Sequence, residues 1–111
     1  MENKKKSAVG ERLGDFAPAY VRFTDDMVYG DLWKRPGLAP RERSLLTLAA
    51  LISAGNFQQI PFHLQLGLDN GLTQAELVEA ITHLCVYAGW PRADTALDIA
   101  KNFFAKKGNP S

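Results

Sequence analysis

The segment 40–54 constrains the fold most, because it reads as a helix with apolar side chains on nearly all sides. It begins at Pro40, which suits a first helical turn, and stops before Gly55. One stripe at helical spacing consists of Leu45, Leu48, Ala49 and Ile52. The opposite face carries Arg43, Thr47, Ala50 and Ala54. A single chain of 111 residues has difficulty covering such a helix completely, so the segment predicts assembly with further copies.

Four further segments have helical spacing, which gives about five helices and no convincing strand. They lie at 18–33, 58–70, 73–89 and 91–106. The segment from 73 has the clearest start, because Thr73 and Glu76 form the pattern of a capping box before an apolar run. The sequence therefore predicts an all-α, oligomeric, multi-helical bundle.

The length of the chain suits one domain behind a flexible arm. A chain of 111 residues is of single-domain size. Residues 1–14, which include the basic run Lys4–Lys6, read as a flexible N-terminal arm. We therefore expect a single helical domain at 15–107.

The composition excludes several classes of protein. The formal net charge is +1, which argues against a dedicated nucleic-acid binder. The longest apolar stretch has about eight residues, whereas a membrane span needs about twenty, and the basic start has no apolar region of the kind a secretory signal needs. The single cysteine, Cys85, rules out an intrachain disulfide and a zinc site built on several cysteines. A cytoplasmic protein fits this composition.

The helix at 73–89 has an unusual outer face. Its core stripe consists of Leu77, Val78, Ile81, Leu84, Cys85 and Ala88, and the cysteine on it is expected to be buried and inert. The opposite side carries Glu76, Glu79, His83 and Tyr87, with Val86 and Trp90 at its edge. Aromatic side chains beside charged ones indicate either an interface or pocket wall, or a solvated face with scattered aromatics.

Three side chains are candidates for chemistry. His63 lies on a stripe with Gln59 and Gly67, where the glycine either leaves space over the imidazole or admits a neighbouring helix. This histidine is therefore either part of a small pocket or a structural residue.

His83 either has its pKa raised by Glu79 or makes only a surface ion pair. Arg43 pairs either with an internal acid, such as Glu42 or Asp31, or with the carboxylate of a ligand. No metal site is expected, because His83 with Glu79 supplies only two possible ligands.

The stretch from Tyr29 to Leu97 resembles the carboxymuconolactone decarboxylase family, which shares the AhpD-like fold. The matching segments are YGDLWKRPGLAPRERSLLTLAALISAGN and PFHLQLGLDNGLTQAELVEAITHLCVYAGWPRA. The redox branch of the family uses a Cys-x-x-Cys-x-x-x-His motif with a preceding glutamate. Alignment on His63 places Asn56 and Gln59 at the two cysteines and Ser44 at the glutamate. The lost thiols exclude the peroxidase cycle, which needs two of them.

The resemblance implies a decarboxylase that needs no cofactor. The expected reaction is decarboxylation of 4-carboxymuconolactone, or of a related lactone or β-keto carboxylate, in the catabolism of aromatic compounds. His63 is the expected proton donor, Arg43 the anchor for negative charge and His83 an assisting group, while Gln59, Tyr87 and Trp90 are expected to contact the substrate. The resemblance further implies a homo-oligomer, a trimer or a hexamer. The alternative is an oligomer that binds a small molecule without turnover.

Overall fold

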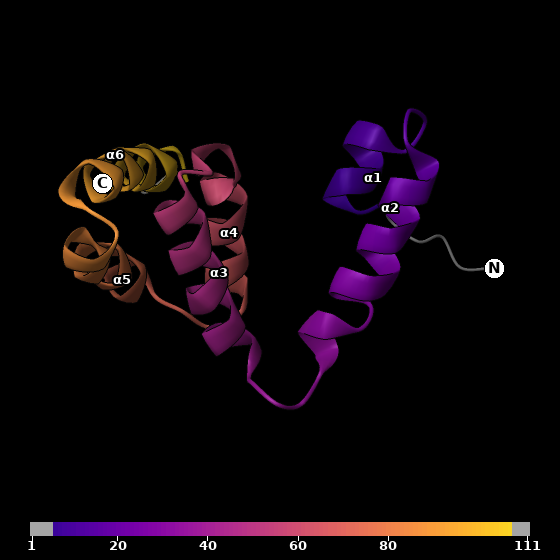
Figure 1. The fold of residues 1–111 in the computed structure, drawn as a ribbon, viewed down its shortest axis with the longest axis horizontal. Coiled ribbons are helices and arrows are strands. Elements are labelled where there is room, and N and C mark those ends of the chain that lie inside the picture. The colour runs from indigo at the N-terminus through magenta and orange to yellow at the C-terminus, as the bar shows by residue number, and fades with distance from the viewer. Residues whose placement is uncertain (1–5, 108–111) are drawn as a thin grey trace. The chain divides into compact units, whose positions relative to one another are not determined.

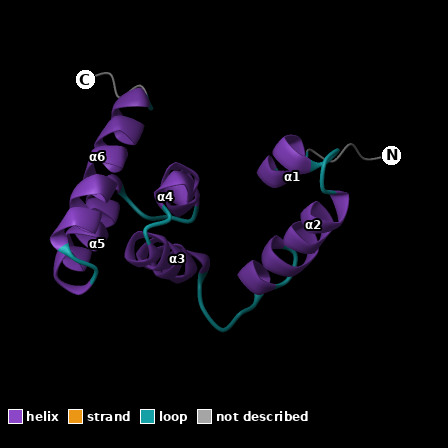
Figure 2. Cartoon of the chain, turned by 45° about the horizontal axis from the view of Figure 1, so that its top comes forward, coloured by secondary structure: helices purple, strands orange, loops and turns teal. Residues whose placement is uncertain are grey.

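The computed structural model describes residues 6–107, and every regular element in that range is a helix, as the sequence predicts. The six α-helices are α1 (Ala8–Leu13), α2 (Pro18–Phe23), α3 (Pro40–Ala54), α4 (Ile60–Asp69), α5 (Gln74–Tyr87) and α6 (Trp90–Lys106). Shorter helices lie at Thr24–Tyr29, Leu32–Lys34 and Phe57–Gln59 (Figure 2). None of the helices within residues 6–107 is long and apolar enough to cross a membrane.

The observed boundaries follow the predicted ones closely in the second half of the chain. Helix α3 has the predicted bounds, and Gly55 ends it with a φ of 76°, a left-handed conformation that suits glycine. The predicted capping box at the start of α5 is present in full. Pro40 and Pro91 each occupy a first-turn position, where the missing N–H has no helical partner to lose.

The predicted helix at 18–33 differs, because it consists of three successive segments. α2 passes into a π-helix at Thr24, and a separate 3₁₀ turn follows at Leu32–Lys34. At the first junction the Thr24 hydroxyl donates to the carbonyl of Tyr20 at 2.9 Å. Such a bond to the preceding turn competes with the regular backbone ladder. Thr47 in α3 and Thr82 in α5 make the same kind of bond and those helices stay regular, so the bond accompanies the change of helix type and does not by itself cause it.

Two compact units make up the chain, and their boundary lies between Leu38 and Ala39. The predicted domain at 15–107 includes parts of both. Residues 1–5 of the predicted arm lie outside the described residues. The described part of the arm contains α1, which the sequence analysis did not foresee; Ser7 caps it by accepting from the N–H of Gly10 at 3.0 Å.

The unit from Ala39 onwards contains the hydrophobic core. Its helices α3 and α4 pack side by side, as do α5 and α6 (Figure 1). Among the described residues the buried apolar side chains are Leu48, Ile52, Ile60, Leu64, Leu72, Leu77, Ile81, Leu84, Ala93, Ala96, Ala100 and Phe104. The predicted apolar stripes of α3 and α5 supply five of them, so these stripes are confirmed as core faces.

Gly67 lets α4 and the start of α5 approach closely. A Cβ atom at this position would lie 3.1 Å from Cδ2 of Leu77 and 3.3 Å from Cδ1 of Leu72. Both distances are shorter than ordinary van der Waals contact. Of the two roles that the sequence allowed for Gly67, close packing of a neighbouring segment is therefore the one observed.

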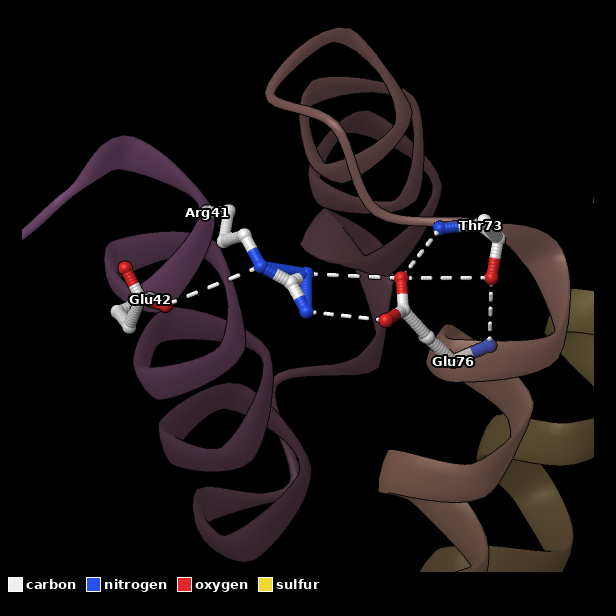
Figure 3. A network of polar contacts seen from close by, with 4 residues as sticks. All are labelled: Arg41, Glu42, Thr73 and Glu76. Atoms are coloured by element: carbon white, nitrogen blue, oxygen red, sulfur yellow. Dashed lines mark hydrogen bonds and ion pairs between the residues drawn. The ribbon is translucent and has the colours of Figure 1, made fainter.

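A polar bridge joins the first turn of α3 to the first turn of α5 (Figure 3). Nη2 of Arg41 donates to Oε2 of Glu76 at 2.9 Å, and Arg41 also lies 3.8 Å from Glu42. The same Glu76 accepts from the backbone N–H of Thr73 at 2.9 Å through Oε1. Glu76 therefore completes the cap of α5 and holds α3, whereas Arg41 has only the second of these roles.

We expect Glu76→Ala to destabilise the protein more than Arg41→Ala. The glutamate variant loses part of the cap and the ion pair, together about 1–2 kcal/mol. The arginine variant loses an exposed ion pair, worth below about 1 kcal/mol. Denaturant unfolding measures both changes in the free energy of unfolding. Equal losses would contradict the dual role of Glu76, and Thr73→Ala, which damages the cap and leaves the ion pair, is the matched control.

Candidate functional site

His63 lies in the first part of α4, after Pro61, and is half-buried. Its ring meets the ring of Phe62 edge-on, with centroids 5.0 Å apart and an angle of 81° between the planes. Burial lowers the pKa of His63 from its ordinary value of 6.5, because the charged imidazolium is poorly solvated there. The uncharged ring therefore predominates at neutral pH, and a proton placed on it is more acidic than on an exposed histidine.

Arg43 lies in the first turn of α3 and is half-buried. The hydroxyl of Thr47 donates to the carbonyl of Arg43 at 2.8 Å. Next to it, Ser44 is 1% exposed and its hydroxyl accepts from the side-chain amide of Asn70 at 3.0 Å. This bond ties the start of α3 to the end of α4, so the two helices run antiparallel.

The antiparallel register sets the separation of Arg43 and His63. Because Ser44 lies beside the end of α4, His63 lies roughly two turns, or about 10 Å, farther along the pair. Arginine has a long, flexible side chain that covers much of such a distance. The backbone positions of the two residues are therefore not adjacent.

The third member of the predicted stripe, Gln59, is exposed. It is the last residue of the 3₁₀ turn Phe57–Gln59 and directly precedes α4. At the other end of the stripe, the space beside Gly67 is occupied by Leu72 and Leu77. The stripe therefore offers an accessible amide and a half-buried imidazole, and it is closed at the glycine.

His83, Tyr87 and Trp90 lie on the outer side of the α5–α6 pair. The rings of His83 and Tyr87 stack with centroids 5.2 Å apart. Tyr87 is 77% exposed and Trp90 is 66% exposed, as is the neighbouring Val86 at 67%. The core-facing side chains of α5 point the other way. Within one chain, the exposed group of His83, Tyr87 and Trp90 therefore does not lie on the core face of α5.

Cys85 is less buried than the sequence analysis expected. It is a free, half-buried thiol that packs against the core cluster. In the part of the chain that the structure describes, no group of three or more His, Cys, Asp or Glu residues is placed to hold a metal ion.

The pair of Ser44 and Asn70 is the polar feature that the sequence analysis missed. Ser44 was noted only as the position of a glutamate in the redox branch. Its spacing of four residues before Leu48 puts it on the core stripe of α3, which is a readable signal for burial. A polar group at such a position needs a hydrogen-bond partner, and Asn70 at the end of α4 provides it.

Comparison with known proteins settles the family. The model of the carboxymuconolactone decarboxylase family matches residues 18–102, which include every candidate site residue. The chain belongs to this family. The resemblance seen in the sequence is therefore confirmed, and so is the choice of a multi-helical AhpD-like bundle.

Two relatives of the chain are named as decarboxylases. The 4-carboxymuconolactone decarboxylase of Acinetobacter baylyi is 37% identical over 98 residues, which are 88% of this chain and 73% of that protein. The nitrosuccinic acid decarboxylase of Metarhizium robertsii is 34% identical over 76 residues, 68% of this chain and 53% of that protein. An uncharacterized 15.0 kDa protein of Paracoccus denitrificans is 30% identical over 84 residues, 74% of this chain and 63% of that protein.

We expect His63 to make the protein less stable as the pH falls. Its pKa is lowered in the folded state, so between the unfolded value near 6.5 and the lower folded value the unfolded chain binds more protons. The free energy of unfolding therefore decreases as the pH falls through this window, and His63 contributes nothing to the change above it.

Denaturant unfolding of the wild type and of His63→Gln, from pH 8 to pH 5, measures this contribution. The variant should lose less stability than the wild type below about pH 6.5. His83→Gln is the matched control, because this histidine is exposed. Parallel curves for the wild type and His63→Gln would contradict the desolvation of His63.

Proposed function

We propose that the chain is a carboxy-lyase that removes CO₂ from a small carboxylate without a cofactor, with 4-carboxymuconolactone or a related lactone or β-keto carboxylate as substrate. The observation that carries this proposal is the 37% identity, over 98 residues, with a protein named 4-carboxymuconolactone decarboxylase. The proposed enzyme acts in the cytoplasm, in the catabolism of aromatic compounds. A single cysteine argues against the two-thiol redox cycle of other family members.

The chemistry needs few protein groups. The bond between the carboxylate carbon and its neighbour breaks, CO₂ leaves, and the electron pair stays on the neighbouring carbon. In a lactone or β-keto acid this pair is delocalised onto oxygen, so the substrate itself provides the electron sink. The protein must hold the carboxylate, stabilise the enolate-like charge and deliver one proton to carbon.

In this proposal His63 delivers the proton. Desolvation makes its imidazolium a stronger acid, which favours transfer to a carbanion. A bound carboxylate has the opposite effect on the pKa, because nearby negative charge favours the charged ring. Substrate binding thus promotes protonation of His63, and the loss of the carboxylate as neutral CO₂ leaves the proton beside the carbon that receives it.

Arg43 holds the negative charge of the substrate in this proposal. It stands in the first turn of α3, about 10 Å along the helix pair from His63. A guanidinium forms two parallel hydrogen bonds to a carboxylate, which fixes the orientation of a planar substrate. The separation suits a molecule that presents to Arg43 a carboxylate or lactone oxygen that it retains, and to His63 the carbon that loses CO₂.

In this proposal the exposed residues contact the substrate only when the protein is an oligomer. Gln59, His83, Tyr87 and Trp90 are accessible in the chain alone. We infer that they contact the substrate, with His83 assisting, once a homo-oligomer, a trimer or a hexamer, covers their faces. A binding protein without turnover is the alternative that a substrate screen must distinguish.

We expect His63→Gln to lower turnover by about 10²- to 10⁴-fold, because glutamine keeps hydrogen-bonding capacity but supplies no acidic proton. The measurement is CO₂ release from lactone carboxylates and β-keto carboxylates, with the helical spectrum as a check on folding. If this variant turned over substrate at the wild-type rate, His63 would not be the proton donor. His83 would then be the next residue to test. No CO₂ from any of these substrates with the wild type would favour the binding protein.

Arg43→Ala should raise KM more than it lowers kcat, because the arginine binds a group that the substrate retains, equally before and during the reaction. Arg41→Ala is the matched control, since Arg41 lies in the same turn but is engaged with Glu76. Steady-state kinetics of the two variants on one confirmed substrate give the comparison. An unchanged KM for Arg43→Ala would remove this residue from the binding site.

A further inference from the structure

The first turn of α3 carries Arg43 and contains no buried apolar side chain. Of its residues 40–44 only Ser44 is buried, at 1% exposed. The next apolar side chains are Leu45, which is half-buried, and Leu48, which is buried. Apolar packing is non-directional, and in α3 it acts mainly on the later turns. The position of the first turn therefore depends more on directional polar contacts than the rest of the helix does.

The hydrogen bond between Ser44 and Asn70 is a contact of this kind. The side-chain amide of Asn70 donates to the Ser44 hydroxyl at 3.0 Å. Because the serine is buried, bulk water does not compete for this bond. A hydrogen bond also requires a definite distance and angle. The bond therefore allows only a small shift or rotation of the start of α3 against the end of α4.

Asn70 is held in place by the backbone at the end of α4. The N–H of Leu72 donates to the carbonyl of Gly67 at 2.9 Å. The N–H of Gly71 donates to the carbonyl of Leu68 at 3.0 Å. These are the two bonds of a Schellman motif, in which Asn70 is the C-cap residue. The amide that reaches α3 therefore starts from a well-defined point of the backbone.

A second side-chain contact of the same turn constrains it less. Nη2 of Arg41 donates to Oε2 of Glu76 at 2.9 Å (Figure 3), but these side chains are 38% and 44% exposed. Water and salt weaken an exposed ion pair. The buried bond of Ser44 is therefore the stronger of these two constraints on the first turn of α3.

We propose that the hydrogen bond between Ser44 and Asn70 positions Arg43 for the decarboxylation, so that both act as positioning residues. This inference rests on the proposed function, in which Arg43 holds a retained group of the substrate and His63 delivers the proton. Ser44 directly follows Arg43, and Asn70 caps the helix that carries His63. Their bond thus sets the separation of guanidinium and imidazole. A substrate that contacts both groups tolerates little change in it, because a displacement of about 1 Å can lower a rate about 10²-fold.

The first test is a double-mutant cycle of Asn70→Ala and Arg43→Ala, measured as kcat/KM on one confirmed substrate. Asn70→Ala alone should lower kcat/KM by about 10- to 100-fold, because the guanidinium is then poorly placed. In the Arg43→Ala background the same change should have almost no further effect, because the side chain that Asn70 positions is absent. No fall for Asn70→Ala, or equal falls in both backgrounds, would overturn the proposal.

Two control variants separate position from stability. Gln65→Ala removes an amide from the same helix, one that donates to Asp69 at 2.9 Å on the exposed side. Ile81→Val removes one buried methyl group from α5 and no polar contact. Both should keep a kcat/KM close to that of the wild type. A fall as large as that of Asn70→Ala in either control would contradict a role in positioning.

Ser44→Ala replaces Asn70→Ala in the cycle if the asparagine variant does not fold. It removes the acceptor of the same bond, and alanine suits a helix interior. The expected kinetic pattern is unchanged, since the bond is lost from its other side.

The second test needs no substrate. In isotope-labelled protein the Nε–H of Arg43 gives its own NMR signal, and its relaxation and its exchange with water report how firmly the side chain is held. Asn70→Ala should make this group more mobile, whereas Gln65→Ala and Ile81→Val should leave it unchanged. An unchanged Arg43 signal in Asn70→Ala would overturn the proposal, whether or not the protein releases CO₂. A more mobile Arg43 in a protein that releases no CO₂ from any tested carboxylate would contradict the proposed function and still support the positioning of Arg43.

Discussion

The unit from Ala39 onwards depends on the burial of one face of α3. Helices α4, α5 and α6 all pack on α3, and its side chains Leu48 and Ile52 are at most 1% exposed. Removing either side chain down to alanine would leave a space that three helices share, and such changes in a core cost about 2–5 kcal/mol. The close approach at Gly67 then fixes where α5 starts, because Leu72 and Leu77 pack directly over the glycine.

This packing also decides which chemical groups are accessible. The face of α3 that carries Leu48 also carries Ser44, and the buried serine is satisfied by Asn70 rather than by a ligand. Arg43, one residue earlier, lies at the edge of that face and stays half-buried. His63 is in a similar position on α4, at the side of Ile60 and Leu64. Both candidate groups thus border the core, and there burial lowers the pKa of His63 while its side chain stays partly exposed.

Local signals in the sequence predicted the helices well, because their causes are local. Pro40, Gly55, Thr73 with Glu76, and Pro91 each act on the backbone within a turn of themselves, and all four signals mark helix ends in the structure. The π-helix after Thr24 was not predictable from apolar spacing, because over six residues that spacing does not distinguish a π-helix from an α-helix. Helix α1 was missed because six residues with a serine cap are too short for a readable period.

The candidate site was predictable only in part, since it depends on contacts between segments distant in sequence. The spacing of Gln59, His63 and Gly67 placed them on one stripe, but only the structure gives the leucines that fill the glycine end. The outward position of Tyr87 followed from helical phase alone, whereas Trp90, which the sequence placed at the edge of the same helix, is the first residue of α6. The partition at Leu38 had no counterpart in the prediction, because a boundary between compact units reflects sparse long-range packing rather than composition.

The proposed chemistry explains how a small helical unit of this kind can serve different substrates within one family. The two named relatives act on a carboxymuconolactone and on nitrosuccinic acid, which are different molecules. In each case a group of the substrate, a conjugated lactone or a nitro group, can accept the electron pair that CO₂ leaves behind. The protein then needs an anchor for negative charge and a proton of suitable acidity, and not a cofactor-like electron sink. In the proposed function these two requirements are met by His63, whose pKa is lowered by burial, and by Arg43, about two turns away along the helix pair. In this proposal, substrate choice therefore lies in the residues around the pair.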